Sequence, residues 1–314
     1  MPTKRKTWIP RPHDVDIIRR IHTFKLLSSH QIIPFFDGST RGIQHRLKRL
    51  VEEKYLFPLP HRRPHEPAIY TLGNRGLLFM RDRFGMPIPK TPRQPQQARR
   101  VKTLYIEHTL EIADTITAIE LACRKRSSIR FISQGEIIAT APEGSRVRAE
   151  ARKLGGRPLY MEARVFYNKR RSVQSTEADH LFGLRFLNEP NSPTAYFFLE
   201  QDRGTETIIT PDLDKESIIK KQLVYLYASG IVPNTKSIYK AQFGVHSIRT
   251  LFVISARYSP GDERVLSFLE ANETVLPTGT GLFLFVTRKS FLDASNALTA
   301  PLINGKHERL TLIG

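Results

Sequence analysis

The sequence predicts a mixed α/β (α+β) protein in two parts, a helical front third and a longer part in which strands and helices alternate. The front third has apolar residues at helical spacing, followed by two short runs that favour strands. A proline-rich, polar and basic segment without periodicity, residues 86–102, is typical of a linker. We therefore expect a first domain over 1–85 and a second over 103–314, which the chain length of 314 residues allows.

The composition indicates a protein that binds polyanions. The chain has 49 Lys and Arg against 30 Asp and Glu, a net charge of +19, and residues 1–100 alone hold 21 against 7. Such an excess attracts nucleic acid or an acidic membrane surface. The single cysteine excludes a disulfide framework and a cysteine-rich zinc module. Neither a signal-peptide pattern nor an apolar run of about 20 residues is present, so we expect a cytoplasmic protein.

The front third has the expected element order of a winged helix-turn-helix. Ser28 or Ser29 can cap the second helix, and Ser39 or Thr40 the third. The expected elements are helices over 14–27, 28–36 and 41–54 and strands over 55–59 and 68–72. In that fold the third helix enters the major groove, and the loop between the strands, the wing, touches the backbone or the minor groove. The alternative is a helical protein-interaction domain with a solvated basic face.

The polar side of the third helix is expected to face DNA. An apolar stripe that includes Ile43 and Leu47 is buried, which leaves the polar residues outward. Arg41 and Gln44 are the expected base readers, because such side chains pair with base edges in the major groove. The other expected DNA contacts are His45, Lys48 and Arg49 on the helix and Arg62 and Arg63 in the wing.

From Thr103 the pattern changes to a long helix followed by alternating strands and helices. The long helix, over 103–125, carries apolar residues on one stripe. The expected strands are 129–133, 158–166, 179–186, 196–200, 247–255 and 281–286, and the expected helices are 214–228 and 262–271. Helix, three strands, helix, strand is the core order of restriction-endonuclease-like, or PD-(D/E)xK, nucleases (αβββαβ).

Three carboxylates are expected to converge at the ends of neighbouring strands. Glu200 and Asp202 lie two residues apart on one strand and therefore point to the same side, and Asp179 begins another strand-like run. Acids brought together in this way repel one another unless a cation lies between them. Oxygen-only ligands suit Mg²⁺ or Mn²⁺, so the three acids are candidate ligands of one or two such ions. The alternative is a set of solvated acids followed by an ordinary turn.

A pair of lysines follows these acids on the next expected helix. Lys220 or Lys221 would orient the attacking water or neutralise the transition state of phosphodiester cleavage. Their side chains point about 100° apart on a helix, and the choice between them stays open. Tyr225 and Tyr227 are either covalent nucleophiles or, as their spacing favours, core residues. Further expected contacts to the DNA backbone are two basic loops near the site, Arg152-Lys153 and Lys169-Arg170-Arg171, and the side chain of Arg203.

A family resemblance is specific around these acids. The replication-relaxation family is similar over Phe198-Leu-Glu-Gln-Asp-Arg-Gly-Thr-Glu206 and Lys221-Gln-Leu-Val-Tyr225. Proteins of that family are associated with plasmid replication and DNA relaxation. A winged helix followed by Asp…Glu-x-Asp…Lys also resembles the MobC-type relaxases of mobilizable plasmids, which use a nuclease-like site in place of histidine-triad and tyrosine chemistry. The chain agrees with this, because it has no His-x-His pair.

The chain departs from these patterns at two points. Ala178 stands where the family often has a proline before its first acid. The strand carries Glu200-Gln-Asp202 where restriction-like nucleases have Glu-x-Lys, so the lysine must come from the following helix. Lys221 fits the family's Lys-x₃-Tyr spacing, although Lys220 also qualifies.

Two functions follow from these expectations. The first is a sequence-specific DNA nickase or relaxase that acts by metal-dependent phosphodiester cleavage at a plasmid or integrative-element origin of transfer or replication. Its partners would be that double-stranded DNA, single-stranded DNA, and other relaxosome or coupling proteins. The second is a non-catalytic DNA-binding regulator of replication or transcription with a nuclease-like domain. Whether the three acids converge on a metal-sized space separates the two.

Overall fold

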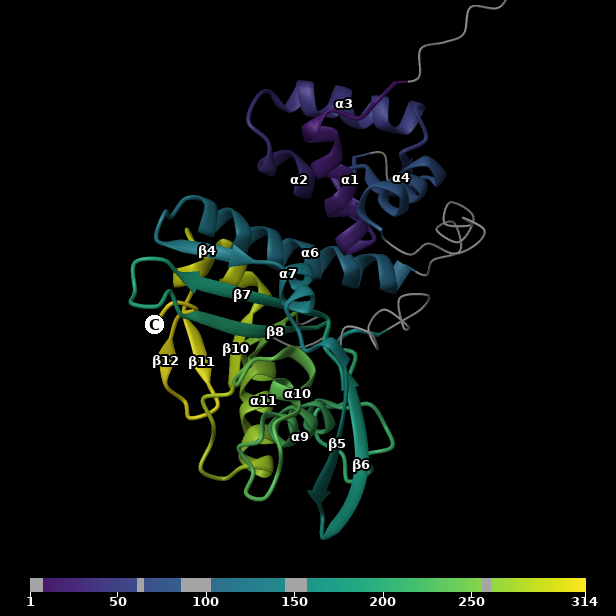
Figure 1. Cartoon of the computed structure of the whole chain (residues 1–314). Helices are drawn as coiled ribbons and strands as arrows, with labels where there is room; N and C mark the ends of the chain where they lie inside the picture. Colours follow the sequence, from purple (N-terminus) through teal and green to yellow (C-terminus); the bar gives the residue numbers. More distant parts are fainter. Residues whose placement is uncertain (1–7, 61–64, 86–102, 145–156, 256–260) are drawn as a thin grey trace, which may run out of the picture. The chain divides into compact units, whose positions relative to one another are not determined.

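The computed structural model describes residues 8–60, 65–85, 103–144, 157–255 and 261–314 (Figure 1). The predicted mixed α/β (α+β) class is confirmed. The chain divides into two compact units, Met1–Thr117 and Ala118–Gly314, and this boundary falls inside one helix, α6, Thr103–Arg124. The predicted linker, 86–102, lies outside the described residues, so the domain limits at 85 and 103 stay a prediction.

The first unit has a small antiparallel sheet with the strand order β1-β3-β2. Up to α6 its elements are α1 Pro12–Phe24, β1 Leu27–Ser28, α2 Ser29–Ile32, the 3-10 helix η1 Ile33–Phe35, α3 Thr40–Glu52, β2 Leu56–Pro58, β3 Ile69–Leu72 and α4 Asn74–Phe84. Three helices and a hairpin follow one another as expected, with β1 and α4 in addition. Pro34 has no N–H to donate, which explains why α2 gives way to a 3-10 turn.

Helix α3 has the buried stripe that the sequence predicts. The Ser39 hydroxyl accepts a hydrogen bond from the Gly42 backbone N–H at 3.1 Å, so Ser39 rather than Thr40 caps the helix. Ile43 and Leu50 are buried. Because these residues share one side of the helix, the polar residues between them lie outward.

The first half of α6 belongs to this unit. The Gln31 side-chain amide donates hydrogen bonds to the Leu110 carbonyl at 2.8 Å and to Asp114 Oδ1 at 2.6 Å. Ile106 packs against the hydrophobic cluster around Leu26. The helix therefore supplies part of the packing of the first unit.

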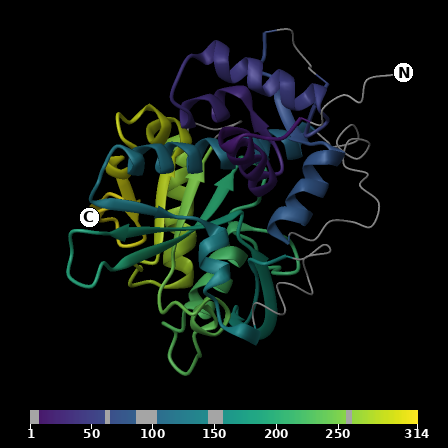
Figure 2. The same cartoon turned by 45° about the horizontal axis from the view of Figure 1, so that its top comes forward.

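The second unit is built on a seven-stranded sheet ordered β12-β11-β10-β9-β8-β7-β4 (Figure 1, Figure 2). After α6 its elements are β4 Ile129–Ile132, α7 Gln134–Ala139, β5 Tyr160–Tyr167, β6 Arg170–Glu177, β7 His180–Phe186, β8 Thr194–Asp202, α9 Ile218–Ser229, α10 Ile238–Phe243, β9 Arg249–Ile254, α11 Gly261–Val275, β10 Phe283–Thr287, α12 Arg288–Asp293, the 3-10 helix η3 Ala297–Thr299, β11 Leu302–Asn304 and β12 Arg309–Leu310. Strands β4, β7 and β8 pair antiparallel, whereas β8, β9 and β10 run parallel. Strands β5 and β6 form a separate hairpin.

Strand β6 corrects the expectation of a basic loop around 169–171. Asn168 and Lys169 form the turn, both with positive φ, and Arg170 and Arg171 already belong to β6. The strand is polar and basic, so its own sequence gives little strand signal. It forms because it pairs along its whole length with the more apolar β5.

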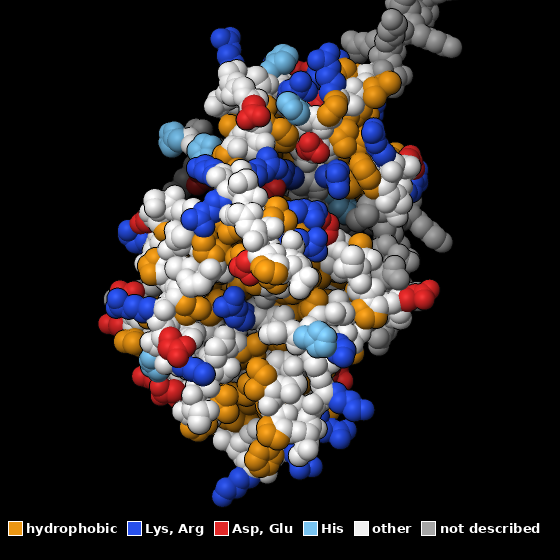
Figure 3. Space-filling model, turned by 60° about the vertical axis from the view of Figure 1, so that its left-hand side comes forward, with side chains coloured by type: hydrophobic (Ala, Val, Ile, Leu, Met, Phe, Trp, Pro, Cys, Tyr) orange, Lys and Arg blue, Asp and Glu red, His pale blue; other side chains and the backbone are white. Residues whose placement is uncertain are grey.

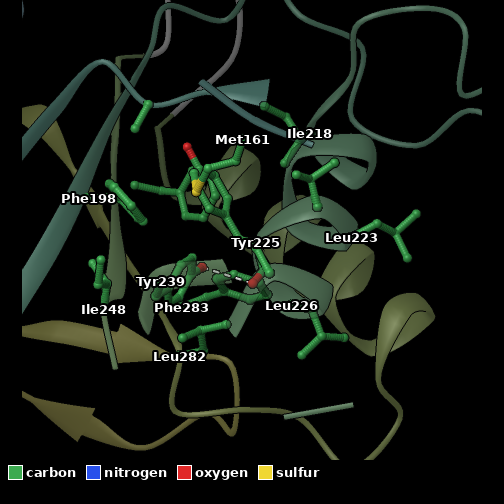
Figure 4. Close-up of a cluster of buried hydrophobic side chains, with 14 of the residues drawn as sticks. Met161, Phe198, Ile218, Leu223, Tyr225, Leu226, Tyr239, Ile248, Leu282 and Phe283 are labelled. Atoms are coloured by element: carbon green, nitrogen blue, oxygen red, sulfur yellow. Dashed lines mark hydrogen bonds between the residues drawn. The ribbon is translucent and has the colours of Figure 1, made fainter. Parts of the chain in front are cut away.

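The main hydrophobic core of the second unit packs β8, β9 and β10 against α9, α10 and α11 (Figure 4). The Phe198 ring lies 5.5 Å from Tyr225, 5.5 Å from Tyr239 and 5.7 Å from Phe243, measured between ring centroids. Tyr225 is 0% exposed, and the Tyr239 hydroxyl donates a hydrogen bond to its carbonyl at 2.8 Å. Tyr225 is therefore a core residue, as its spacing predicts, whereas Tyr227 is only partly buried.

Replacing Phe198 by Ala is expected to lower the free energy of unfolding by about 3–5 kcal/mol, because it leaves a cavity among three aromatic rings. Urea titration of the second unit's unfolding would measure this. Val173→Ala is the control, since Val173 is 55% exposed and its truncation opens no cavity. Equal losses in the two variants would contradict the assignment of Phe198 to the centre of the core.

Candidate functional site

Strands β7 and β8 bring the first two candidate acids side by side. Asp179 directly precedes β7, and its backbone N–H donates to the Leu199 carbonyl at 3.1 Å. Its Oδ2 accepts a hydrogen bond from the Gln201 backbone N–H at 2.8 Å. In the same register His180 pairs with Leu199, so Asp179 lies across from Glu200. The predicted convergence of these two acids is present.

Glu200 is a buried carboxylate held by two donors. It is 2% exposed, Lys221 Nζ donates to its Oε2 at 3.0 Å, and the Tyr225 hydroxyl donates to its Oε1. Burial raises the pKa of Glu200, the charge of Lys221 opposes that shift, and the charge of Asp179 adds to it. Burial and the neighbouring Glu200 charge raise the pKa of Tyr225 well above its usual value. Tyr225 is thus a neutral donor that fixes one oxygen of Glu200.

Lys221, and not Lys220, is the lysine among the acids. Lys221 Nζ also donates to Glu206 Oε1 at 2.9 Å, whereas Lys220 Nζ donates to Glu216 Oε1, one helical turn away, at 2.8 Å. The two lysines have different partners because successive residues of a helix point about 100° apart. Although burial opposes it, the charges of Glu200 and Glu206 raise the pKa of Lys221, so the ammonium keeps its proton.

Asp202 forms an ion pair that the sequence does not predict. Arg264, on α11, donates from Nε to Asp202 Oδ2 at 2.5 Å and from Nη2 to Oδ1 at 2.9 Å. Nη2 also donates to the Glu206 carbonyl at 3.0 Å, and the Gly204 N–H donates to Asp202 Oδ2 at 3.1 Å. The sequence near Arg264 does not indicate this role, because Arg264 lies 62 residues after Asp202, on a helix whose sequence shows only the usual spacing of apolar residues. Arg203, an expected phosphate contact, is only 7% exposed.

The donor chemistry of these residues fits Mg²⁺ or Mn²⁺, since all the donors are carboxylate oxygens. Glu206 Oε2 is buried and has no hydrogen-bond partner among the described residues. In the structure, however, Lys221 pairs with Glu200 and Glu206, and Arg264 pairs with Asp202, so two cations already offset part of the charge of the acids. Within the described part of the chain, no three His, Cys, Asp or Glu side chains have the arrangement of a metal site. The metal therefore stays a prediction.

The polar side of α3 carries the expected DNA contacts of the first unit. Arg41, Gln44, His45, Lys48 and Arg49 are all exposed, and Arg49 pairs with Glu53 at 2.9 Å. Sequence reasoning missed Arg46, whose Nη1 donates to the buried Asp14 Oδ1 at 3.0 Å. A groove of about 670 Å³ lies along this side, lined by Trp8, Arg11, Asp14, Ser39, Arg41, Gly42, His45, Arg46 and Arg49.

Other predicted contacts are dispersed. Arg62 and Arg63 of the wing, and Arg152 and Lys153, lie outside the described residues. Lys169, Arg170 and Arg171 are exposed at the tip of the β5–β6 hairpin. In Figure 3 Lys and Arg side chains are scattered among acidic and apolar side chains rather than gathered in one patch. In the described ranges no helix is long and apolar enough to cross a membrane.

A sequence model of the replication-relaxation family matches residues 18–230. The chain belongs to the replication-relaxation family. That membership suggests a role in replication or DNA relaxation. The matched region of this replication-relaxation protein includes α3, the three acids and Lys221, whereas Arg264 lies beyond it. Neither a curated protein nor a solved structure matches the chain.

Replacing Lys221 by Met is expected to destabilise the second unit by about 3–5 kcal/mol, because Glu200 would lose the charge partner of a buried pair. The loss should be larger at pH 8 than at pH 6. Without Lys221 the folded-state pKa of Glu200 rises further above its unfolded value, so the folded state binds more protons and loses stability as pH increases.

Urea unfolding measures both effects, and Lys220→Met is the matched control, since its partner Glu216 is 66% exposed. Adding Glu200→Gln to Lys221→Met should restore most of the lost stability. An equal loss in both lysine variants would show that the Lys221–Glu200 pair is not the cause.

Proposed function

We propose that this protein is a metal-dependent DNA nickase of the relaxase type, acting at a plasmid or integrative-element origin of transfer or replication. The observation that carries the proposal is the site on β7, β8 and α9, where Asp179 lies across from Glu200 and Lys221 donates to Glu200 at 3.0 Å. Paired acids and a lysine are groups that metal-dependent phosphodiester cleavage uses. The order α6, β4, β7, β8, α9, β9 supports a restriction-endonuclease-like core with the β5–β6 hairpin as an insertion.

Each residue of the site has a separate task in this proposal. Asp179, Glu200 and Asp202 would hold Mg²⁺ or Mn²⁺, which when bound polarises a phosphate and lowers the pKa of water. Lys221, kept protonated by its acidic neighbours, would neutralise negative charge that develops on the phosphate. Tyr225 holds the orientation of Glu200. Water adds to phosphorus while one P–O ester bond breaks, so the nicked strand has a phosphate at one end and a hydroxyl at the other.

The first unit would supply the sequence specificity. Arg41 and Gln44, exposed on α3, would read base edges in the major groove, while Lys48 and Arg49 contact phosphates. Because the first unit would bind the DNA sequence and the second unit would cut, the binding energy of the first unit could position one phosphodiester bond for cleavage. The resemblance to MobC-type relaxases further supports a cytoplasmic location and other relaxosome or coupling proteins as partners.

A second candidate is a DNA-binding regulator of replication or transcription without catalysis. It is favoured by one observation, the ion pair between Arg264 and both carboxylate oxygens of Asp202. A carboxylate engaged in this way has to give up a charged partner before it can bind a metal ion. The two candidates differ in whether the protein cuts DNA at all.

Glu200→Gln is expected to reduce nicking at least about 100-fold while leaving DNA affinity nearly unchanged, because it removes a negatively charged ligand of the proposed metal ion. The assay follows conversion of supercoiled plasmid carrying the protein's own transfer origin to open circles, with and without Mg²⁺ or Mn²⁺. Glu216→Gln is the control, since Glu216 is exposed and pairs only with Lys220 among these groups. If the intact protein binds its site tightly but does not nick the DNA with either metal, the nickase proposal is rejected and the non-catalytic regulator is retained.

Arg41→Ala and Gln44→Ala in the full chain are expected to change sequence preference, at a cost of about 1–3 kcal/mol for the preferred site. Lys48→Ala should weaken binding to all duplexes alike and reduce the salt slope by about 1. Competition gel shifts at several salt concentrations measure both. Arg81→Ala, an exposed arginine on α4, is the control. Unchanged preference and affinity in all three α3 variants would remove this helix from the DNA interface.

A further inference from the structure

The β5–β6 hairpin is a long two-stranded ribbon, separate from the three-stranded and the seven-stranded sheets. Its strands pair antiparallel from Tyr160↔Glu177 to Tyr167↔Arg170. Asn168 and Lys169 connect them with φ of 48° and 61°, the geometry of a tight two-residue turn. Eight residues of strand extend about 26 Å. The free end of the ribbon points away from the seven-stranded sheet (Figure 1).

The two faces of the ribbon differ in character. Met161, Ala163 and Val165 alternate along β5 and are buried, and β5 packs against α9. The opposite face is exposed and carries the pairs Arg164↔Val173 and Phe166↔Arg171. A strand requires only one buried face, so the apolar residues on the outer face are not needed for packing.

The tip half of the outer face combines apolar and positively charged groups. Phe166 is 52% exposed and Val173 55% exposed. Arg164 and Arg171 lie beside them on this face and Lys169 is in the turn, and among the described residues none of these three forms an ion pair. The two acids of this face, Glu162 and Glu177, lie in the half nearer the base, where Glu177 pairs with Arg157 at 2.5 Å. Within the described ranges, the tip half of the outer face therefore has positive charge without an acidic partner, next to an exposed aromatic ring.

Positive side chains around an exposed aromatic ring suit a nucleic acid, which has both phosphates and planar bases. Positive side chains contact phosphates, and an exposed aromatic ring stacks on an unpaired base. In duplex DNA the bases already stack on one another, so a ring could reach them only by insertion between base pairs. The exposed Phe166 therefore favours single-stranded over double-stranded DNA.

The ribbon is also connected to the candidate site. Strand β6 ends at Glu177, two residues before Asp179. Helix α9 carries Lys221 and also contacts the ribbon, with the Tyr227 hydroxyl donating to the Phe166 carbonyl at 3.4 Å. The nine residues from Arg171 to Asp179 limit the separation of the ribbon tip and the acids to roughly 30 Å.

We propose that the β5–β6 ribbon binds single-stranded DNA, with Phe166 stacked on one unpaired base and Arg164 and Arg171 on the neighbouring phosphates. The inference rests on the proposed function, since a nicked or melted origin supplies the unpaired strand. It assigns the ribbon the task of holding that strand within roughly 30 Å of the site on β7, β8 and α9.

The test measures binding of the full chain to a fluorescently labelled oligothymidine by anisotropy, with EDTA present so that no cleavage occurs. Phe166→Ala should weaken this binding about 5- to 150-fold, the loss of one stacked base. Phe166→Tyr should retain it, and the affinity for duplex DNA should change little in either variant. Arg164→Gln combined with Arg171→Gln should reduce the salt slope by about 1.4, two phosphates of a single strand. Leu266→Ala is the control, since Leu266 is 56% exposed on α11.

Three outcomes overturn the proposal. Phe166→Ala could leave oligothymidine binding unchanged, or weaken binding to single-stranded and duplex DNA equally. It could also weaken only the binding of the protein to anionic phospholipid vesicles, measured in parallel, and leave DNA binding intact. The last of these would identify a membrane contact. The nickase proposal is tested separately, because anisotropy in EDTA requires no catalysis. Protein that never nicks but binds single strands through Phe166 supports the ribbon inference alone, and nicking with no role for Phe166 in binding contradicts it alone.

Discussion

The buried ion pair between Lys221 and Glu200 is the interaction on which the candidate site depends. A carboxylate that is 2% exposed loses most of its hydration, at a cost of several kcal/mol. Lys221 and Tyr225 replace the lost water with two donors. Both come from α9, so the distance between α9 and β8 must be held closely. The aromatic packing of Phe198 against Tyr225 maintains that distance.

The segment that follows β8 is held in place by Lys221 and by a second cation, Arg264. Arg264 holds Asp202 and the Glu206 carbonyl, while Lys221 holds the Glu206 side chain. Two cations from different helices therefore compensate acids that would otherwise repel one another. A phosphate or divalent ion that entered this site would have to compete with a charged side chain already in place.

Under the proposed function, the two units would present two different surfaces to nucleic acid. Helix α3 presents side chains that donate and accept hydrogen bonds, such as Arg41 and Gln44, which suits the edges of paired bases. The β5–β6 ribbon presents the Phe166 ring among cations, which suits the faces of unpaired bases. A protein that finds a duplex site and then handles one strand needs both kinds of contact. The strongly basic composition would serve both contacts, since each of these surfaces would approach phosphates.

The sequence by itself determined the fold class, the order of most elements and the side of α3 that faces outward, because periodic burial and capping are local properties. It also placed Asp179 beside Glu200, since alternation and strand pairing constrain the side on which each acid lies. Only the tertiary structure decided that Lys221 faces the acids, that Arg264 binds Asp202, and that Arg170 and Arg171 lie on a strand. The first depends on how α9 is rotated about its axis when it packs. The other two depend on partners distant in sequence: an arginine on α11, and an apolar strand that pairs with a polar one.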